Sequence, residues 1–177
     1  VIWSYMDQKG TGRIRKFVAV DQLAAVAAVP WMTDAEQSES GATFGVDGLV
    51  DLGASLNGED GPAATESFVR SMFSGTPAQE VWDFVAQGIT STPAYAGVPL
   101  LFDHATQDWR DVLPRIDVPT LVLGCDGSRV SPDSQRYIAD RIPNAQLHVF
   151  PTDVANSHFM FLENPEAFNA VVEEFLS

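Results

Sequence analysis

Three short segments of the sequence have the pattern of buried strands, namely residues 16–20, 120–123 and 146–150, and the first two are apolar at almost every position. A strand with one face in water alternates apolar and polar residues, whereas a parallel strand covered by helices on both faces is apolar throughout. The first two segments therefore predict buried parallel strands. His148 interrupts the third segment, which predicts a strand near an edge of the sheet.

Signals for helices lie between and after these strands. Ser131 followed by Pro132 has the residue types of an N-cap and a first helical position, and predicts a helix through about Ile142. Asn164 followed by Pro165 predicts a second helix, in which four apolar residues share one face: Phe168, Val171, Val172 and Phe175. The alternation of strands and helices predicts a parallel α/β architecture.

Residues 30–109 differ from the rest, because they lack strong strand signals. The sequence Thr-Pro-Ala-Gln at 76–79 predicts a helix that starts with a capping box, and Thr92 with Pro93 predicts the start of another helix. We interpret 30–109 as a helical cap or lid inserted into the sheet domain. The α/β core then consists of residues 1–29 and 110–177.

The first residues of the chain predict that part of the sheet domain lies upstream of them. Residues 1–6 are mostly apolar and have the pattern of the later part of a helix that ends at Lys9 and Gly10. The strand at 16–20 also needs a neighbour on its other side. We therefore expect a preceding strand and the start of this helix upstream of Val1, in an N-terminal half of the same protein.

Charge and composition exclude several classes of function. The 177 residues contain 10 Lys and Arg against 24 Asp and Glu, a net charge of −14, which repels nucleic acid and anionic lipid. Cys125 is the single cysteine, so an internal disulfide and a cysteine-based metal site are excluded. With no paired-histidine spacing, we expect no metal and no organic cofactor. The sequence contains neither a signal peptide nor a membrane-length apolar run, and we expect no membrane association and a cytoplasmic location.

Three groups with catalytic chemistry follow the predicted strands. Asp21 comes directly after the first strand, Asp126 comes shortly after the second, and His158 lies in the loop after the third. Ligands of open parallel sheets bind at the carboxyl ends of the strands, so these side chains are expected on one rim. The order acid then histidine is that of the α/β-hydrolases, in which the nucleophile precedes both.

Three stretches of the chain resemble α/β-hydrolases, most closely the esterase and cofactor-free haloperoxidase-like subgroup: residues 12–22, 108–124 and 157–169. The resemblance implies a partial α/β-hydrolase fold with a helical cap, and hydrolysis of small carboxylic esters by a Ser-His-Asp triad. The Gly-x-Ser-x-Gly motif of the family is absent. By the resemblance it lies just before Val1, so no serine of this chain is proposed as the nucleophile.

The resemblance leaves two candidates for the acid of the triad. Many relatives carry the acid about four residues before a proline, and counting back from Pro132 reaches Ser128. Asp126 is two residues away from that position. In other relatives the acid follows the preceding strand, where Asp21 fits directly. We favour Asp21, with Asp126 as the alternative, and expect the acid to orient His158 and stabilise its imidazolium.

Other residues are candidates for substrate binding. Trp31 and Met32 follow the Asp21 segment and are candidates for lining a pocket, with ordinary cap packing an equal alternative. His104 is a candidate for substrate contact, although a structural role in a cap helix is favoured. An upstream Asp nucleophile would instead make the protein a haloalkane dehalogenase or epoxide hydrolase. An inert residue there would make it a non-catalytic ligand-binding protein.

Overall fold

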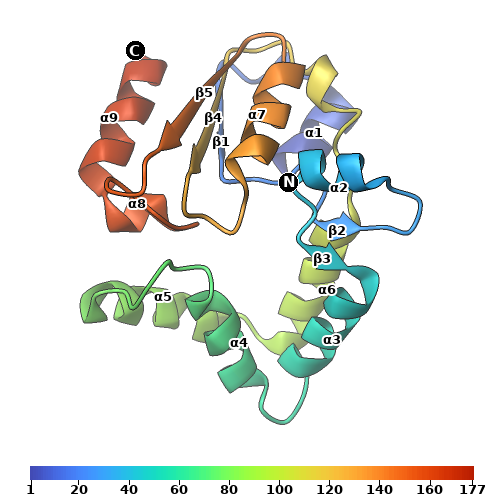
Figure 1. The fold of residues 1–177 in the computed structure, drawn as a ribbon, viewed down its shortest axis with the longest axis vertical. Helices are drawn as coiled ribbons and strands as arrows, with labels where there is room; N and C mark the ends of the chain where they lie inside the picture. The colour runs from blue at the N-terminus through green and yellow to red at the C-terminus, as the bar shows by residue number, and fades with distance from the viewer.

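A three-stranded parallel sheet forms the centre of the upper part of the molecule (Figure 1). The computed structural model describes residues 1–177, except the side chain of Thr90. The strand order is β1 (Phe17–Val20), β4 (Thr120–Cys125), β5 (Ala145–Phe150). All three predicted strands are confirmed. Every residue of β4 is buried, and β5, which contains His148, is an edge strand of the described sheet, as predicted.

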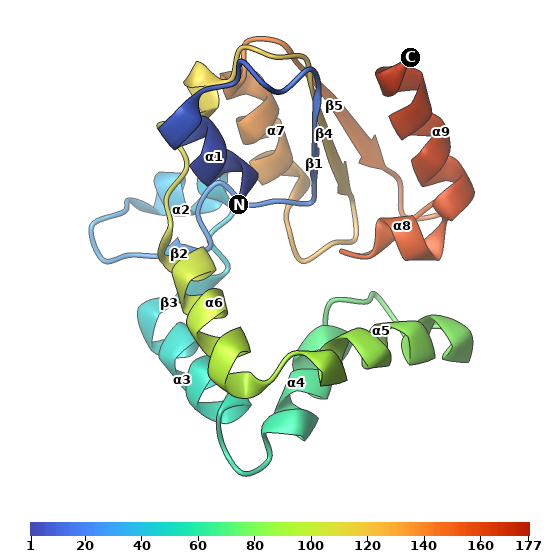
Figure 2. The same cartoon turned by 180° about the vertical axis from the view of Figure 1, so that it is seen from behind.

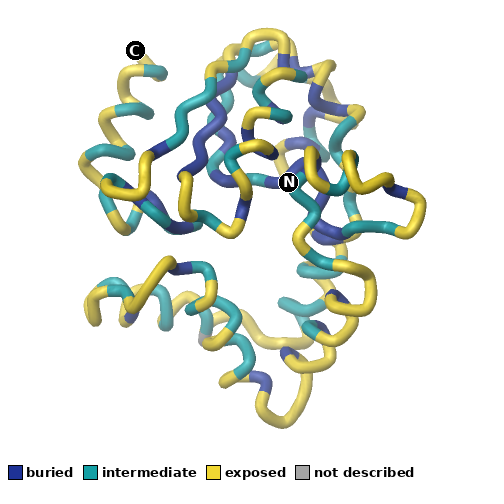
Figure 3. The backbone as a smooth tube through the Cα atoms, viewed as in Figure 1, coloured by how far each residue is buried: buried dark blue, intermediate teal, exposed yellow. Residues whose placement is uncertain are grey.

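Helices cover both faces of this sheet (Figure 2). On one face, α1 (Ile2–Lys9), α7 (Pro132–Arg141) and the short 3₁₀ helix η1 (Leu113–Arg115) pack around Val122. On the other face, α8 (Met160–Glu163) and α9 (Pro165–Leu176) pack around Leu121, Leu123 and Phe150, and the predicted apolar face of α9 contacts this cluster. In Figure 3 burial is greatest on the central strand β4, whereas β1 and β5 are mostly intermediate. The predicted parallel α/β architecture is therefore confirmed.

The predicted N-caps differ in outcome. The side chain of Ser131 accepts a hydrogen bond from the Ser134 N–H, and that of Asn164 accepts one from the Ala167 N–H, so both helix starts are confirmed. The predicted capping box at 76–79 is wrong. Gln79 is the first residue of α5 (Gln79–Ser91), not its third, and its side chain donates to Asp83 instead.

The remaining helices form an arm that lies below the sheet in the view of Figure 1. They are α3 (Val46–Leu56), α4 (Gly61–Arg70), α5 and α6 (Ala94–Thr106). A capping box of Thr33 and Glu36 starts α2 (Asp34–Ser40), which packs against α7. A short parallel pair, β2 (Ala27–Ala28) and β3 (Phe44–Gly45), lies between α2 and the arm.

The chain leaves and rejoins the sheet domain at one place. Ala25 forms an antiparallel bridge with Asp108, and the Trp109 N–H donates to the Ala24 carbonyl at 2.9 Å. The Arg110 guanidinium binds Asp108 at 2.6 Å and Glu36 at 3.2 Å. These contacts hold the segments on either side of residues 26–107 together. No helix in the described part of the chain is long and apolar enough to span a membrane.

Candidate active site

Asp21 occupies the carboxyl end of β1 in an unusual backbone conformation. Its N–H donates to the Leu123 carbonyl at 2.7 Å and so extends the pairing with β4, while its φ of 48° lies in the left-handed region. Asp tolerates this region better than most residues. The buried Gln135 side chain donates to the next carbonyl, that of Gln22, at 2.9 Å. The chain therefore turns at Asp21 with the backbone held on both sides.

His158 comes from the loop between β5 and α8, and its ring meets Asp21. The distance from His158 Nδ1 to Asp21 Oδ2 is 2.9 Å, across 137 residues of sequence. The Asp21 side chain is fully buried, whereas that of His158 is 36% exposed. Because Nδ1 faces the carboxylate, Nε2 is the nitrogen that can exchange a proton with a reacting group.

Asp126, the alternative acid, does not share this position. Its N–H donates to the Phe150 carbonyl at 3.0 Å, continuing the ladder with β5, and the residue is exposed. Among the side chains that the structure describes, Asp21 is the carboxylate within 4.0 Å of a His158 ring nitrogen. The geometry brings Asp21 and His158 together and leaves Asp126 outside the pair.

Ser128 also belongs to the site, although it was not predicted from the sequence. Its Oγ donates to the same Asp21 Oδ2 at 2.5 Å and accepts the Val130 N–H at 3.1 Å. The signal was present in the sequence, because counting back from Pro132 leads to this position. Asp21 Oδ1 is buried without a hydrogen-bond partner among the described groups, so Oδ2 carries the polar contacts of the carboxylate.

The loops that carry Ser128 and His158 are held in contact. The Cys125 thiol donates to the Ser157 carbonyl at 3.2 Å, and burial, followed by the charge of Asp21, raises the pKa of this thiol to about 11. A Cβ added at Gly127 would lie 1.4 Å from Asn156 Oδ1. The same Cβ would lie 2.8 Å from the Asn156 backbone oxygen, so a side chain at position 127 requires a shift where the two loops touch. Cys125 is a buried structural thiol.

The arm also contacts the site through the loop between α4 and α5. The His158 N–H donates to the Met72 carbonyl at 3.2 Å, and the rings of Phe73 and Phe159 lie 4.6 Å apart. Arg129 donates to the Ser71 hydroxyl at 2.9 Å. The position of the histidine loop therefore depends on the arm as well as on the sheet.

The three residues predicted to bind substrate lie apart from this pair of side chains. Trp31 is 80% exposed and Met32 is buried. His104 is exposed on α6 and lines a groove of about 280 Å³ along β1. Among the described side chains, none of the three has a hydrogen bond, ion pair or ring contact with Asp21 or His158. Their role in binding stays a prediction.

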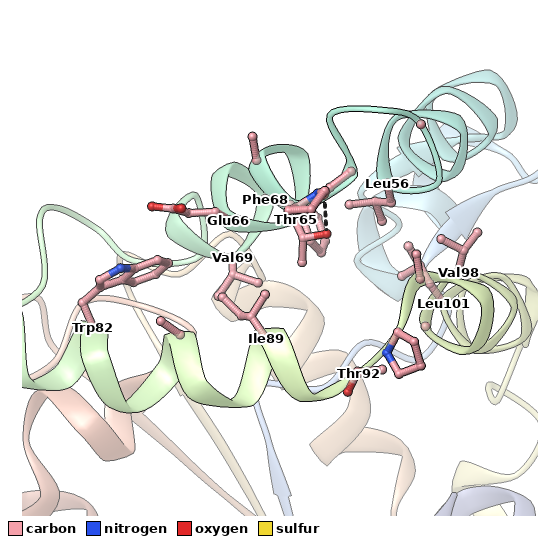
Figure 4. A pocket seen from close by; sticks show the side chains of 18 residues that line it. Leu56, Thr65, Glu66, Phe68, Val69, Trp82, Ile89, Thr92, Val98 and Leu101 are labelled. Atoms are coloured by element: carbon pink, nitrogen blue, oxygen red, sulfur yellow. Dashed lines mark hydrogen bonds between the residues drawn. The ribbon is translucent and has the colours of Figure 1, made fainter.

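A larger apolar cavity, of about 750 Å³, lies between α4, α5 and α6 (Figure 4). Its volume is in the range of small-molecule sites. Val69, Trp82 and Ile89 line it from α4 and α5, and Glu66 brings a carboxylate to its wall. Arg70 neutralises that carboxylate at 2.8 Å and lies 3.4 Å from the centroid of the Trp82 ring. No pattern in the sequence predicted this cavity.

The described side chains were also compared with the donor sets that metal ions need. In the described part of the chain, no group of three or more His, Cys, Asp or Glu side chains is arranged to hold a metal ion. The chemistry that the site can perform with its own groups is proton transfer at His158, supported by the buried carboxylate of Asp21.

Comparison with known proteins identifies relatives of the same architecture. The model of the "Alpha/beta hydrolase family" matches residues 10–171. A protein of Synechocystis sp. that carries the name non-heme chloroperoxidase is 28% identical over 160 residues, which cover 83% of this chain and 53% of that protein. This chain therefore spans about half the length of that relative.

Solved structures give the same result for the fold. A bromoperoxidase from Bacillus anthracis superposes with a TM-score of 0.84 at 16% identity, covering 99% of this chain and 62% of that one. An esterase from Exiguobacterium antarcticum superposes with a TM-score of 0.82 at 18% identity, again covering 99% and 62%. At these identities the likeness shows the fold.

Proposed function

Because the chain belongs to the α/β-hydrolase family, we propose that the protein hydrolyses small carboxylic esters with a Ser-His-Asp triad, of which this chain carries His158 and Asp21. The observation that carries the proposal is the 2.9 Å contact between His158 Nδ1 and the buried Asp21 Oδ2 at the carboxyl end of a parallel sheet. A buried carboxylate on Nδ1 keeps the proton on that nitrogen and leaves Nε2 as a base.

The proposed reaction has two steps. His158 Nε2 accepts the proton of a serine hydroxyl as the serine oxygen bonds to the ester carbonyl carbon. The carbon–oxygen bond to the alcohol then breaks, and the alcohol leaves with the proton from His158. In the second step His158 takes a proton from water, which attacks the acyl-serine, and the carboxylic acid is released as the serine regains its proton. Asp21 stabilises the imidazolium in both steps.

The serine is proposed to lie in a part of the protein upstream of Val1, since residues 1–177 contain no Gly-x-Ser-x-Gly motif. Two features of β1 support an upstream partner. Among the described strands β1 pairs with β4 alone, so one of its edges has unpaired backbone groups. A groove of about 280 Å³ follows this strand and is bordered by Trp3 and Trp109. An upstream strand parallel to β1 would occupy this edge and bring the serine to the same rim as His158.

The proposal is tested with the full-length protein and a chromogenic ester such as p-nitrophenyl acetate. His158→Ala removes the base, and kcat is expected to fall by about 10³-fold or more while the fold is retained. His148→Ala is the matched control, because this histidine packs against Phe150 on β5 and has no proposed catalytic role. Ester hydrolysis that survives His158→Ala would overturn the assignment.

A further inference from the structure

One oxygen atom of Asp21 serves two hydrogen-bond donors. Oδ2 lies 2.9 Å from His158 Nδ1 and 2.5 Å from Ser128 Oγ, whereas Oδ1 is buried and has no partner among the described groups. The carboxylate can turn about its side-chain bonds, and the single contact with His158 does not fix its plane. The Ser128 hydroxyl supplies the second point of attachment that fixes it.

The hydroxyl of Ser128 is itself oriented by the backbone. Its oxygen accepts the Val130 N–H at 3.1 Å and its hydrogen is donated to Asp21 Oδ2. Val130 is buried in the apolar cluster with Leu23 and Val26, which follow Asp21 closely in sequence. Gly127, on the other side, packs against Asn156 of the histidine loop. Ser128 therefore sits on a loop that is anchored to the acid segment and to the histidine segment together.

From this arrangement we propose that Ser128 is a positioning residue for the triad: it holds the Asp21 carboxylate in the orientation that accepts the His158 Nδ1–H. The inference rests on the proposed function and adds a fourth side chain to it. Ser128 does not contact the substrate in this role, and it acts on the reaction through Asp21. Its loss is expected to lower the rate of the chemical steps and to leave substrate binding unchanged, because binding does not depend on the plane of the carboxylate.

The test compares three variants of the full-length enzyme. Ser128→Ala removes the donor to Asp21 and one acceptor of a backbone N–H. Ser131→Ala is the matched control, since it lies on the same loop and also loses one accepted backbone N–H, that of Ser134, without touching Asp21. Ser128→Thr keeps the hydroxyl. We expect kcat to fall about tenfold in Ser128→Ala with KM unchanged, to stay within about twofold of wild type in Ser131→Ala, and to return to within about threefold in Ser128→Thr.

Two outcomes in these kinetics overturn the proposal. One is an unchanged kcat in Ser128→Ala. The other is an equal loss in Ser128→Ala and Ser131→Ala, which would indicate a general effect on the loop. If Ser128→Ala does not fold, as judged by circular dichroism, Ser128→Cys replaces it, because it keeps the shape with a weaker donor.

A second readout separates this proposal from the proposed function. The proton between His158 Nδ1 and Asp21 gives a far-downfield ¹H resonance, assigned by its loss in His158→Ala. If the enzyme hydrolyses no ester, the proposed function fails while this resonance still reports on Ser128. We expect Ser128→Ala to shift or broaden it and Ser131→Ala and Ser128→Thr to preserve it. An unchanged resonance in Ser128→Ala would refute the positioning role.

Discussion

Replacing Asp21 by Asn removes one negative charge that lies 2.9 Å from His158 Nδ1 in a fully buried position. When His158 becomes positively charged during the reaction, the attraction between two unit charges at this distance is about 6 kcal/mol with an effective dielectric constant of about 20. Each 1.36 kcal/mol corresponds to a factor of ten in rate, so the loss corresponds to about 10⁴-fold. The 36% exposure of His158 screens part of the charge, and we expect a fall in kcat of about 10³- to 10⁴-fold.

The Asn variant has a second effect in the same direction. The Asn amide nitrogen can occupy the place of Oδ2 and donate to Nδ1, which then loses its own proton. The remaining ring proton moves to Nε2, and this nitrogen can no longer act as a base. The effect needs no change of fold, because Asn has nearly the same shape as Asp.

The assay is ester hydrolysis by the full-length protein, with Asp126→Asn as the control. Asp126 is an exposed residue on the same rim, and its variant is expected to keep kcat within about threefold of wild type. Thermal unfolding followed by circular dichroism establishes that both variants are folded. The reverse pattern, with Asp126→Asn inactive and Asp21→Asn active, would transfer the role of the acid to Asp126 and refute the reasoning from the 2.9 Å contact.

Three further predictions follow from the same region. The double variant Asp21→Gly with Ser128→Asp moves the carboxylate to position 128 and leaves a glycine at position 21, where φ is 48°. We expect its kcat to be at least tenfold higher than that of Asp21→Gly alone. No recovery would show that a carboxylate at position 128 cannot act as the acid for His158. Burial raises the pKa of Cys125 to about 11, so about one thiol in 10³ is ionised at pH 8. Cys125 in the native protein should therefore resist alkylation by iodoacetamide until the protein is unfolded. Rapid labelling of Cys125 in the native state, detected by mass spectrometry, would contradict this prediction. Gly127→Ala brings a Cβ to 1.4 Å from Asn156 Oδ1 in the histidine loop and is expected to lower the free energy of unfolding by about 1–3 kcal/mol. The control Gly12→Ala has open space around it and should change the free energy of unfolding by less than about 0.5 kcal/mol. Equal Tm values for the two variants would contradict the close contact at Gly127.

Local patterns were sufficient for the sheet. The continuous apolar segments predicted β1 and β4 because both faces of these strands are covered by helices, and the polar His148 indicated the edge position of β5. Ser131 and Asn164 predicted helix starts because an N-cap depends on residues only three positions apart. Interactions of this short range are visible in a sequence.

The chemistry of the site depends on interactions of much longer range. Asp21 was favoured because it follows its strand directly, whereas Asp126 is followed by Gly127 and lies two residues from the usual family position. Both follow neighbouring strands, so the sequence alone did not decide between them. The structure separates them through the backbone turn at Asp21 and the position of the His158 loop, 137 residues away. Ser128 escaped assignment for the same reason, since its partner lies 107 residues away.

The arm was harder to predict than the sheet. The pattern at 76–79 matched a capping box, but the helix starts at Gln79, with Ala78 as its N-cap residue and no side-chain hydrogen bond at this cap. The contact of the Met72 carbonyl with the His158 N–H and the cavity between α4, α5 and α6 arise from the packing of helices that are distant in sequence. No local motif encodes either feature.

The most direct test of the proposed triad is covalent labelling of the full-length protein with a fluorophosphonate, followed by peptide mass spectrometry. These reagents modify a serine that a neighbouring base has activated. The account predicts one modified serine, located upstream of Val1, with labelling that is lost in His158→Ala and slowed by orders of magnitude in Asp21→Asn. A label on a serine within residues 1–177, or a label that persists in His158→Ala, would contradict it.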